Sequence, residues 1–397
     1  MAFGEDALDW GPAFDEDASA RRPYLELAIG YRLLAIFPAV RRILQPILAV
    51  AAGLGLGLAA TAIAGENPWH VLVILARGAF GSGYGLGMTL FYSTPLIFTG
   101  LSVAVAFQAG LFNIGAEGQL TLGALAAAAV GAVWPGLPWP LAPVLAGVAA
   151  LAAGMLWGAI PGWLRARRGS HEVINTIMLN FIAAGLASYV ALYVLSNPDS
   201  QNPETRPIGA GYCISQYAVF GGAPVSAALP LALLAAVAVW LLMSRTVLGF
   251  EMRAVGQSEA AARAAGIDPG RIQILALALA GGLAGLVGVG EVLGNAQKFK
   301  VGFSPEYGFM GIAVALLGRN QPAGVVAAAM LFGALHKGAA DLDMETEHLT
   351  REVSMIFQAL IILSVSAEGV WNWMSARRRA VKGVKPVGAP LEPGVAS

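Results

Sequence analysis

The sequence predicts an all-α protein that crosses a membrane about ten times, and three observations carry that prediction. Hydrophobic residues make up 57% of the 397 residues and charged residues 12%, against roughly a half and a quarter in soluble domains. Apolar stretches of membrane-spanning length recur along the chain. The 50 glycines suit the close helix packing found in membranes. These features favour a polytopic membrane fold over a soluble one.

The two ends of the chain differ from its apolar middle. Residues 1–42 are acidic and then basic, and they hold no apolar run with a small-residue cleavage site, so we expect a cytoplasmic extension and no cleavable signal peptide. Residues 43–379 are the expected transmembrane domain, and residues 380–397 a cytoplasmic tail. The one cysteine, Cys213, excludes an internal disulfide and a cysteine metal cluster.

Hydropathy predicts the order of the spans. The expected segments are 43–64, 88–107, 120–133, 141–160, 173–195, 225–243, 272–293, the short pair 307–317 and 323–335, and 353–365. Residues 69–80 are expected to lie at the membrane interface. The two short segments are hinged at 318–322, and we expect protein to shield them, because neither is long enough to cross lipid alone.

The basic residues predict the orientation. All Lys and Arg residues but six fall on one side of these segments. The six exceptions are Arg77, Arg206, Lys298, Lys300, Lys337 and Arg351. By the positive-inside rule the basic side is cytoplasmic, so both termini are expected there.

The stretch from Phe107 to Gly123 interrupts an apolar run with the polar residues Asn113, Glu117 and Gln119 and with several glycines. Polar groups and broken helices at membrane depth persist only where protein or a water-filled cavity surrounds them. Two roles stay open. The three side chains could line a translocation path, or they could brace the broken helix by hydrogen bonds.

Two further polar pairs are candidates for the same path. Asn175 and Asn180 lie five positions apart on one expected helix, hence about 140° apart around it, so at most one of them faces a pore. Glu291 and Asn295 lie at the outer end of the segment 272–293. They could form the outer mouth, dock an external protein, or mark a solvated span end.

The internal loop 244–271 contains a short helix signal. Ser258 is a suitable N-cap, residues 259–265 are good helix formers, Gly266 suits the C-cap, and Pro269 stops the helix. A short helix held between two spans can move as a rigid lever, although an ordinary interfacial helix fits the spacing as well.

The sequence does not predict an enzyme. It contains no phosphate-binding GxxxxGK[ST] motif and no HExxH motif, and no nucleophile or metal-ligand cluster stands out. The four histidines lie near expected loops or span ends. We therefore expect no catalytic residue, no metal site and no cofactor in this chain.

Four motifs carry a resemblance to a known family. Glu259-Ala260-Ala261, with Gly266 following, resembles the EAA-type coupling loop of ATP-binding-cassette (ABC) importer permeases, although the spacing to Gly266 departs from the best-known sugar permeases. Three more specific stretches resemble the nucleoside branch of the ribose-permease-like family: 110–119 (GLFNIGAEGQ), 172–180 (EVINTIMLN) and 311–320 (GIAVALLGRN). The likeness runs from about Ile43 to Arg379.

The resemblance implies a permease subunit of an importer in the bacterial cytoplasmic (inner) membrane. Its implied partners are a cytoplasmic ABC ATPase with two nucleotide-binding modules, which would hold ATP and Mg, an external substrate-binding lipoprotein, and a second permease in a heterodimer. Membrane lipid surrounds such a subunit, and no nucleic acid is implied. The coupling residues carried over by the resemblance are Arg253, Ser258, Glu259, Ala260, Ala261 and Gly266.

The expected cargo is a neutral polar solute, namely a nucleoside, with a simple sugar left open, because hydroxyl groups match amides and carboxylates without a fixed counter-charge. A proton-coupled secondary transporter or channel is the alternative, with Glu117 as its proton site. The cationic internal loop and its short helix favour the ATP-driven importer, because a proton-coupled carrier has no need of them.

Overall fold

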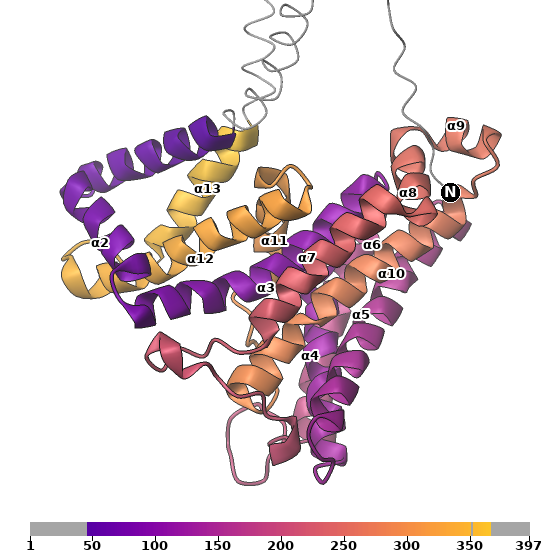
Figure 1. Ribbon diagram of the computed structural model, residues 1–397, viewed down its shortest axis with the longest axis horizontal. Helices are drawn as coiled ribbons and strands as arrows, with labels where there is room; N and C mark the ends of the chain where they lie inside the picture. Colours follow the sequence, from indigo (N-terminus) through magenta and orange to yellow (C-terminus); the bar gives the residue numbers. More distant parts are fainter. Residues whose placement is uncertain (1–45, 351, 367–397) are drawn as a thin grey trace, which may run out of the picture. The chain divides into compact units, whose positions relative to one another are not determined.

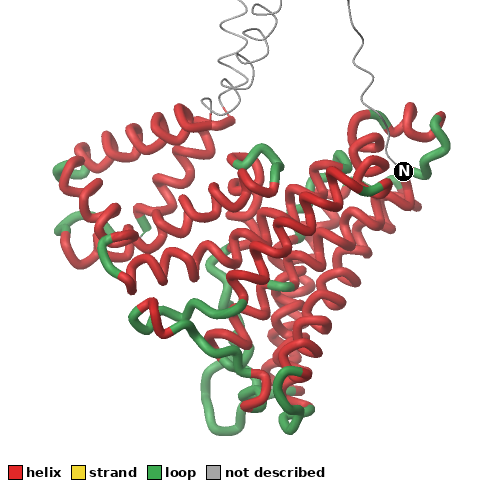
Figure 2. Tube along the Cα trace, viewed as in Figure 1, coloured by secondary structure: helices red, strands yellow, loops and turns green. Residues whose placement is uncertain are grey.

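The computed structural model describes residues 46–350 and 352–366, and these fold into helices joined by loops (Figures 1 and 2). Within them, extended pairing is limited to isolated bridges such as that of Glu204 with Lys300. Residues 53–366 form one compact unit, and the described residues 46–52 fall outside it. The expected cytoplasmic extension 1–42, the tail 380–397 and residues 367–379 of the expected transmembrane domain lie outside the described residues.

Within the described residues, eight helices are long and apolar enough to cross a membrane. They are Pro46–Ile63, α3 (Gly83–Gln108), α4 (Ala116–Val133), α5 (Leu141–Arg168), α6 (Glu172–Tyr189) with its π-helical extension η2 (Val190–Val194), α7 (Ala228–Arg245), α10 (Pro269–Gly285) with the π-helical η5 (Val289–Ala296), and α12 (Pro322–Glu345). Three shorter apolar helices are α2 (Pro68–Phe80), α11 (Tyr307–Leu317) and α13 (Val353–Ser366). The predicted all-α polytopic fold is confirmed.

One predicted segment is wrong in length. The segment 323–335 was expected to be too short to span, but α12 continues to Glu345 and has 24 residues. The sequence argument ended it where charged residues begin. In the structure Lys337 Nζ lies 2.6 Å from Asp341 Oδ1 one turn later, and Arg77 of α2 pairs with Glu345 at 2.6 Å. Because these charges are paired, the helix continues through them.

Small residues hold the long helices together. α10 packs along α5, and a Cβ added to Gly154 of α5 would stand 2.1 Å from the carbonyl oxygen of Gly281 on α10. A Cβ added to Gly281 would likewise stand 2.1 Å from the carbonyl oxygen of Gly154. Backbones that approach this closely leave no room for a side chain, which is how helices pack tightly in lipid.

The two polar ends of the bundle lie apart. The short helices α8 (Val247–Gln257) and α9 (Glu259–Ala264) lie at one end of the long α5 and α10 helices, and the long loop after α6 lies at the other (Figure 1). This arrangement agrees with the predicted order of the spans, in which one segment, 225–243, separates these two loops.

Candidate functional site

The predicted break in the apolar run lies between α3 and α4. α3 ends at Gln108 and α4 begins at Ala116. Gly110 between them has a φ of +72°, a left-handed backbone conformation that glycine adopts without steric cost. The chain therefore turns at the position where the sequence placed its glycines.

Two of the predicted polar residues of the break bind each other. Asn113 Nδ2 donates to Gln119 Oε1 at 2.9 Å, and Gln119 Nε2 donates to Asn113 Oδ1 at 3.1 Å. Asn113 Nδ2 also lies 3.2 Å from Ser102 Oγ, and Asn113 Oδ1 accepts from the amide of Gly115 at 3.1 Å. Both amide side chains are fully buried. These contacts are those that the bracing role requires, because a buried amide is stabilised only when it is hydrogen-bonded.

Asn180 of α6 holds the same break from the side. Its Oδ1 accepts from the amide of Gly118 at 2.9 Å, and its Nδ2 donates to the carbonyl of Ile114 at 2.9 Å. One side chain thus binds backbone groups on both sides of the α4 start. Asn175 does not join this group, since its Oδ1 accepts from Ser170 at 2.9 Å. The predicted separation of the two asparagines around α6 agrees with this difference.

Glu117 connects the start of α4 to the start of α11. Its Oε2 accepts from the amide of Gly308 at 2.7 Å, and the hydroxyl of Ser304 also hydrogen-bonds to this carboxyl group. A Cβ on Gly308 would meet the backbone nitrogen of Glu117 at 2.3 Å. The two helix starts therefore touch, with a carboxylate between them.

The internal loop contains the predicted short helix, and it contains a second helix that the sequence analysis missed. In α9 the Ser258 hydroxyl accepts from the amide of Ala261 at 3.2 Å, as an N-cap does. Gly266 follows the helix with a φ of +84°. Pro269 begins α10 rather than only ending α9, with Asp268 as the cap of α10. The missed helix is α8, which Thr246 caps.

The predicted coupling residues lie mostly on one exposed surface. Ser258, Glu259, Ala260, Ala261 and Gly266 are exposed, whereas Arg253 on α8 is half-buried. Ala262 is 2% exposed and attaches α9 to the rest of the unit. Two turns of helix with a small, solvent-facing surface at a bundle end are suited to docking a partner.

Arg165 at the end of α5 connects α9 to α6. Its Nη2 lies 3.8 Å from Glu259 Oε1, and its Nη1 lies 3.1 Å from Glu172 Oε2 in the first turn of α6. Glu259 Oε1 also accepts from Gln273 of α10 at 2.9 Å. In the sequence, Arg165 stands out only as one of the basic residues that predict the orientation. Its position opposite the first acid of the next helix was the available signal.

The loop also touches the break directly. A Cβ on Gly256, at the end of α8, would stand 2.3 Å from the carbonyl oxygen of Gln108 and 2.9 Å from the nitrogen of Gly110. The exposed helix α9 is therefore linked to the broken segment by two routes. One is the backbone contact through Gly256, and the other runs through Arg165 and α6.

Glu291, which the sequence predicts at the outer mouth, is buried. It lies in η5 and is 9% exposed. Asn295 itself is exposed. Burial of Glu291 argues against a solvated span end. Within the described part of the chain, no group of three or more His, Cys, Asp and Glu residues could hold a metal ion.

Residues 85–366 match the family described as branched-chain amino acid transport system, permease component. The chain belongs to this permease family. It is therefore a multi-pass transport subunit, and the resemblance predicted from the sequence is confirmed. The family match does not favour the alternative of a proton-coupled carrier or channel.

Several curated relatives cover most of both chains. The guanosine ABC transporter permease protein NupP of Bacillus subtilis is 38% identical over 82% of this chain and 93% of its own. The glucose ABC transporter permease protein TsgB13 of Haloferax volcanii is 36% identical over 80% and 85%. The nucleoside ABC transporter permease protein NupB of Lactococcus lactis is 34% identical over 86% and 95%. No solved structure matches.

Proposed function

We propose that this permease imports nucleosides across the bacterial inner membrane, with both termini in the cytoplasm and with ATP hydrolysed by a separate subunit. Two of the three relatives named above are called guanosine and nucleoside permeases, and the third is called a glucose permease. The single observation that carries the coupling to ATP is α9, an exposed, capped helix tied to the broken segment.

The partners proposed for this permease are those of an ABC importer. A cytoplasmic ABC ATPase with two nucleotide-binding modules holds ATP and Mg, and an external binding lipoprotein delivers the cargo. A second, different permease completes the pore. In support, the relatives include two differently named permeases from one organism in three cases, NupP with NupQ, NupB with NupC, and TsgB13 with TsgC13.

In this proposal α9 transmits the motion of the ATPase. The ATPase docks on the exposed surface of Ser258, Glu259, Ala260 and Ala261. Movement of α9 passes through Arg165 to the start of α6, and Asn180 on α6 holds the start of α4. Tilting α6 therefore displaces the broken helix, while Gly256 presses on Gly110 from the other side. The path opens inward in response to a change at α9.

The test is uptake by proteoliposomes that contain both permeases, the ATPase and the binding lipoprotein. The probes are guanosine, cytidine, ribose, glucose and leucine, the last because the family description names branched-chain amino acids. We expect nucleoside uptake that stops when the ATPase is replaced by a variant that cannot hydrolyse ATP. Preferential uptake of glucose or leucine would overturn the cargo assignment, and uptake without ATP hydrolysis would overturn the mechanism.

A further inference from the structure

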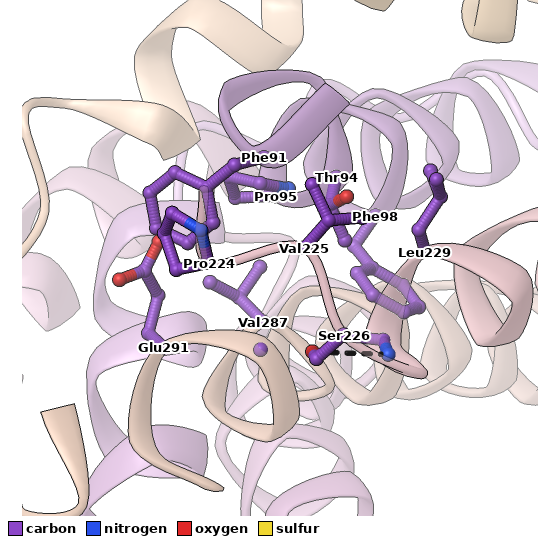
Figure 3. Close-up of a pocket in the computed structure, with 12 residues that line it drawn as sticks. Phe91, Thr94, Pro95, Phe98, Pro224, Val225, Ser226, Leu229, Val287 and Glu291 are labelled. Atoms are coloured by element: carbon purple, nitrogen blue, oxygen red, sulfur yellow. Dashed lines mark hydrogen bonds between the residues drawn. The ribbon is translucent and has the colours of Figure 1, made fainter. Parts of the chain in front are cut away.

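A small cavity lies beside Glu291, and the proposed coupling through α9 does not use it. It is lined by Phe91, Thr94, Pro95 and Phe98 of α3, by Pro224, Val225, Ser226, Ala228 and Leu229 at the entry to α7, and by Val287, Gly290 and Glu291 (Figure 3). Three separate elements thus meet around one carboxyl group. None of the lining residues is a Lys, Arg or His.

The cavity holds an unpaired acceptor. Glu291 is nine-tenths buried, and its Oε1 has no hydrogen-bond partner among the described residues. Figure 3 shows the Glu291 carboxyl group beside Phe91 and Pro224. A buried carboxyl oxygen without a donor is costly. This oxygen therefore favours a ligand that brings an N–H or O–H group.

Pro95 leaves the carbonyl oxygen of Phe91 without its helical hydrogen bond, and both residues line the cavity. Proline has no N–H, so the helical bond from position 95 to the carbonyl of Phe91 cannot form. The hydroxyl of Thr94 is already used, since it donates to the carbonyl of Leu90 at 2.8 Å. Among the polar side chains of the lining, Glu291 has an oxygen without a partner, whereas Ser226 Oγ accepts from the amide of Ala228 at 3.4 Å. The remaining lining is apolar with two phenyl rings.

We propose that this cavity is the closed form of a subsite for the base of a neutral nucleoside, whose N–H edge binds Glu291 and whose flat face packs on Phe91 or Phe98. This proposal rests on nucleosides being the cargo. An anionic solute is disfavoured, because the cavity offers a carboxyl group and no cation. A sugar supplies donors and a C–H face, but it lacks the planar π-system with which a base packs on a phenyl ring.

The conformation described is closed around this subsite. The cavity measures about 10 Å³, the space of a single water molecule. A base enters only after α3 and the start of α7 separate, and Pro95 supplies a place where α3 can bend. The π-helical turn that carries Glu291 is a second irregular element, of a kind that occurs frequently at functional sites.

The test compares guanosine with a guanosine analogue methylated at its base N–H groups in proteoliposomes of the complete transporter. The uptake ratio of the two solutes is measured for the wild type and for Glu291→Gln, with the same binding lipoprotein. Because it is a ratio, it does not depend on the amount of folded transporter. We expect Glu291→Gln to narrow the wild-type preference for guanosine several-fold, because the amide keeps an acceptor oxygen but loses the charge that strengthens the hydrogen bond.

Further measurements distinguish a failure of the subsite from a failure of the cargo assignment. Glu345→Gln changes a carboxyl group paired with Arg77 outside the cavity, and its ratio is expected to equal that of the wild type. Phe98→Leu, a change in the apolar lining, is expected to lower guanosine uptake relative to ribose. If the wild type imports nucleosides but Glu291→Gln and Phe98→Leu keep the wild-type ratios, the cavity holds water only and the subsite is refuted. If the wild type does not import nucleosides, the cargo assignment itself has failed.

Discussion

The carboxylate of Glu117, in the first turn of α4, accepts a hydrogen bond of 2.7 Å from the backbone amide of Gly308 in the first turn of α11. The first N–H groups of a helix have no partner inside it, and its N-terminus carries partial positive charge. A carboxylate placed between two such ends stabilises both. Glu117 therefore joins the broken segment to the short helix α11, which explains a carboxylate in an apolar region without a proton-transfer role.

Substitutions of Glu117 test whether its carboxylate joins α4 to α11. Glu117→Ala removes the acceptor, whereas Glu117→Gln keeps an oxygen that can accept from Gly308 and loses only the charge. We expect thermal stability of the purified permease complex to fall in the order wild type, Gln, Ala, with the alanine variant losing about 1–3 kcal/mol. Thermal unfolding in detergent measures this. Unchanged stability of the alanine variant with abolished uptake would make Glu117 a contact of the cargo instead.

The close approach at Gly308 makes a second prediction. In Gly308→Ala the new methyl group would stand 2.3 Å from the nitrogen of Glu117 and 2.6 Å from its Cα, so the two helix starts must separate. We expect reduced assembly and lower uptake. Gly185→Ala is the matched control, because this glycine lies within α6 and a Cβ there meets nothing within 4 Å. If both variants assemble alike, α4 and α11 do not pack as described.

Arg165 is expected to act as a positioning residue for coupling. Arg165→Gln breaks the ion pairs with Glu172 and Glu259, so α9 loses its polar link to α6. We expect ATP hydrolysis to continue while uptake falls several-fold, and Arg165→Lys to restore part of the uptake. Arg167→Gln is the control, since this neighbouring arginine has no ion pair among the described residues. Parallel losses of hydrolysis and uptake in Arg165→Gln would indicate a general structural role.

The ion pair in the long loop between α6 and α7 predicts that this loop loosens in acid. Lys298 Nζ lies 2.8 Å from Glu204 Oε1, and this hydrogen bond holds the pKa of the Glu204 carboxyl below its ordinary value of 4.5. A lowered pKa in the folded state adds stability above the ordinary pKa, and that stability is lost as the pH falls through the folded-state pKa. We expect loop proteolysis to accelerate below pH 4.5 in the wild type.

The variant Glu204→Gln tests whether the pair of Glu204 with Lys298 causes this acid response. Glutamine cannot ionise, so the variant is expected to be cleaved faster than the wild type at neutral pH and to show a smaller change on acidification. The measurement is the rate of limited proteolysis of the loop between α6 and α7 across the pH range. Equal pH profiles for the two proteins would show that the pair with Lys298 does not fasten the loop.

Much of the architecture could be predicted because apolar length and polar interruptions are local properties of the sequence. The break near Gly110, the N-cap at Ser258 and the short helix 307–317 follow from such local patterns, and the structure contains all three. The extension of α12 beyond residue 335 could not be predicted, because the charge of Lys337 is neutralised by an ion pair with Asp341. Residue counts do not show which charges are paired.

The contacts of the candidate site could not be predicted from the sequence for a related reason. Asn113 and Gln119 could be recognised as out of place in an apolar run, but the choice between lining a path and bracing depends on partners. Asn180, 62 positions after Gly118, supplies one of them. Arg165 and Gly256 were missed as connectors because their partners come close only when the helices pack.

The most direct test of the central claim is the number of nucleoside molecules imported per ATP hydrolysed in proteoliposomes of the complete transporter, compared between the wild type and Glu259→Lys. Glu259 accepts from Gln273 and faces Arg165 on a surface that the ATPase is proposed to bind. We predict that the variant hydrolyses ATP but imports little, so that the ratio falls at least tenfold. An unchanged ratio, with normal uptake, would contradict the claim that α9 couples this permease to its ATPase.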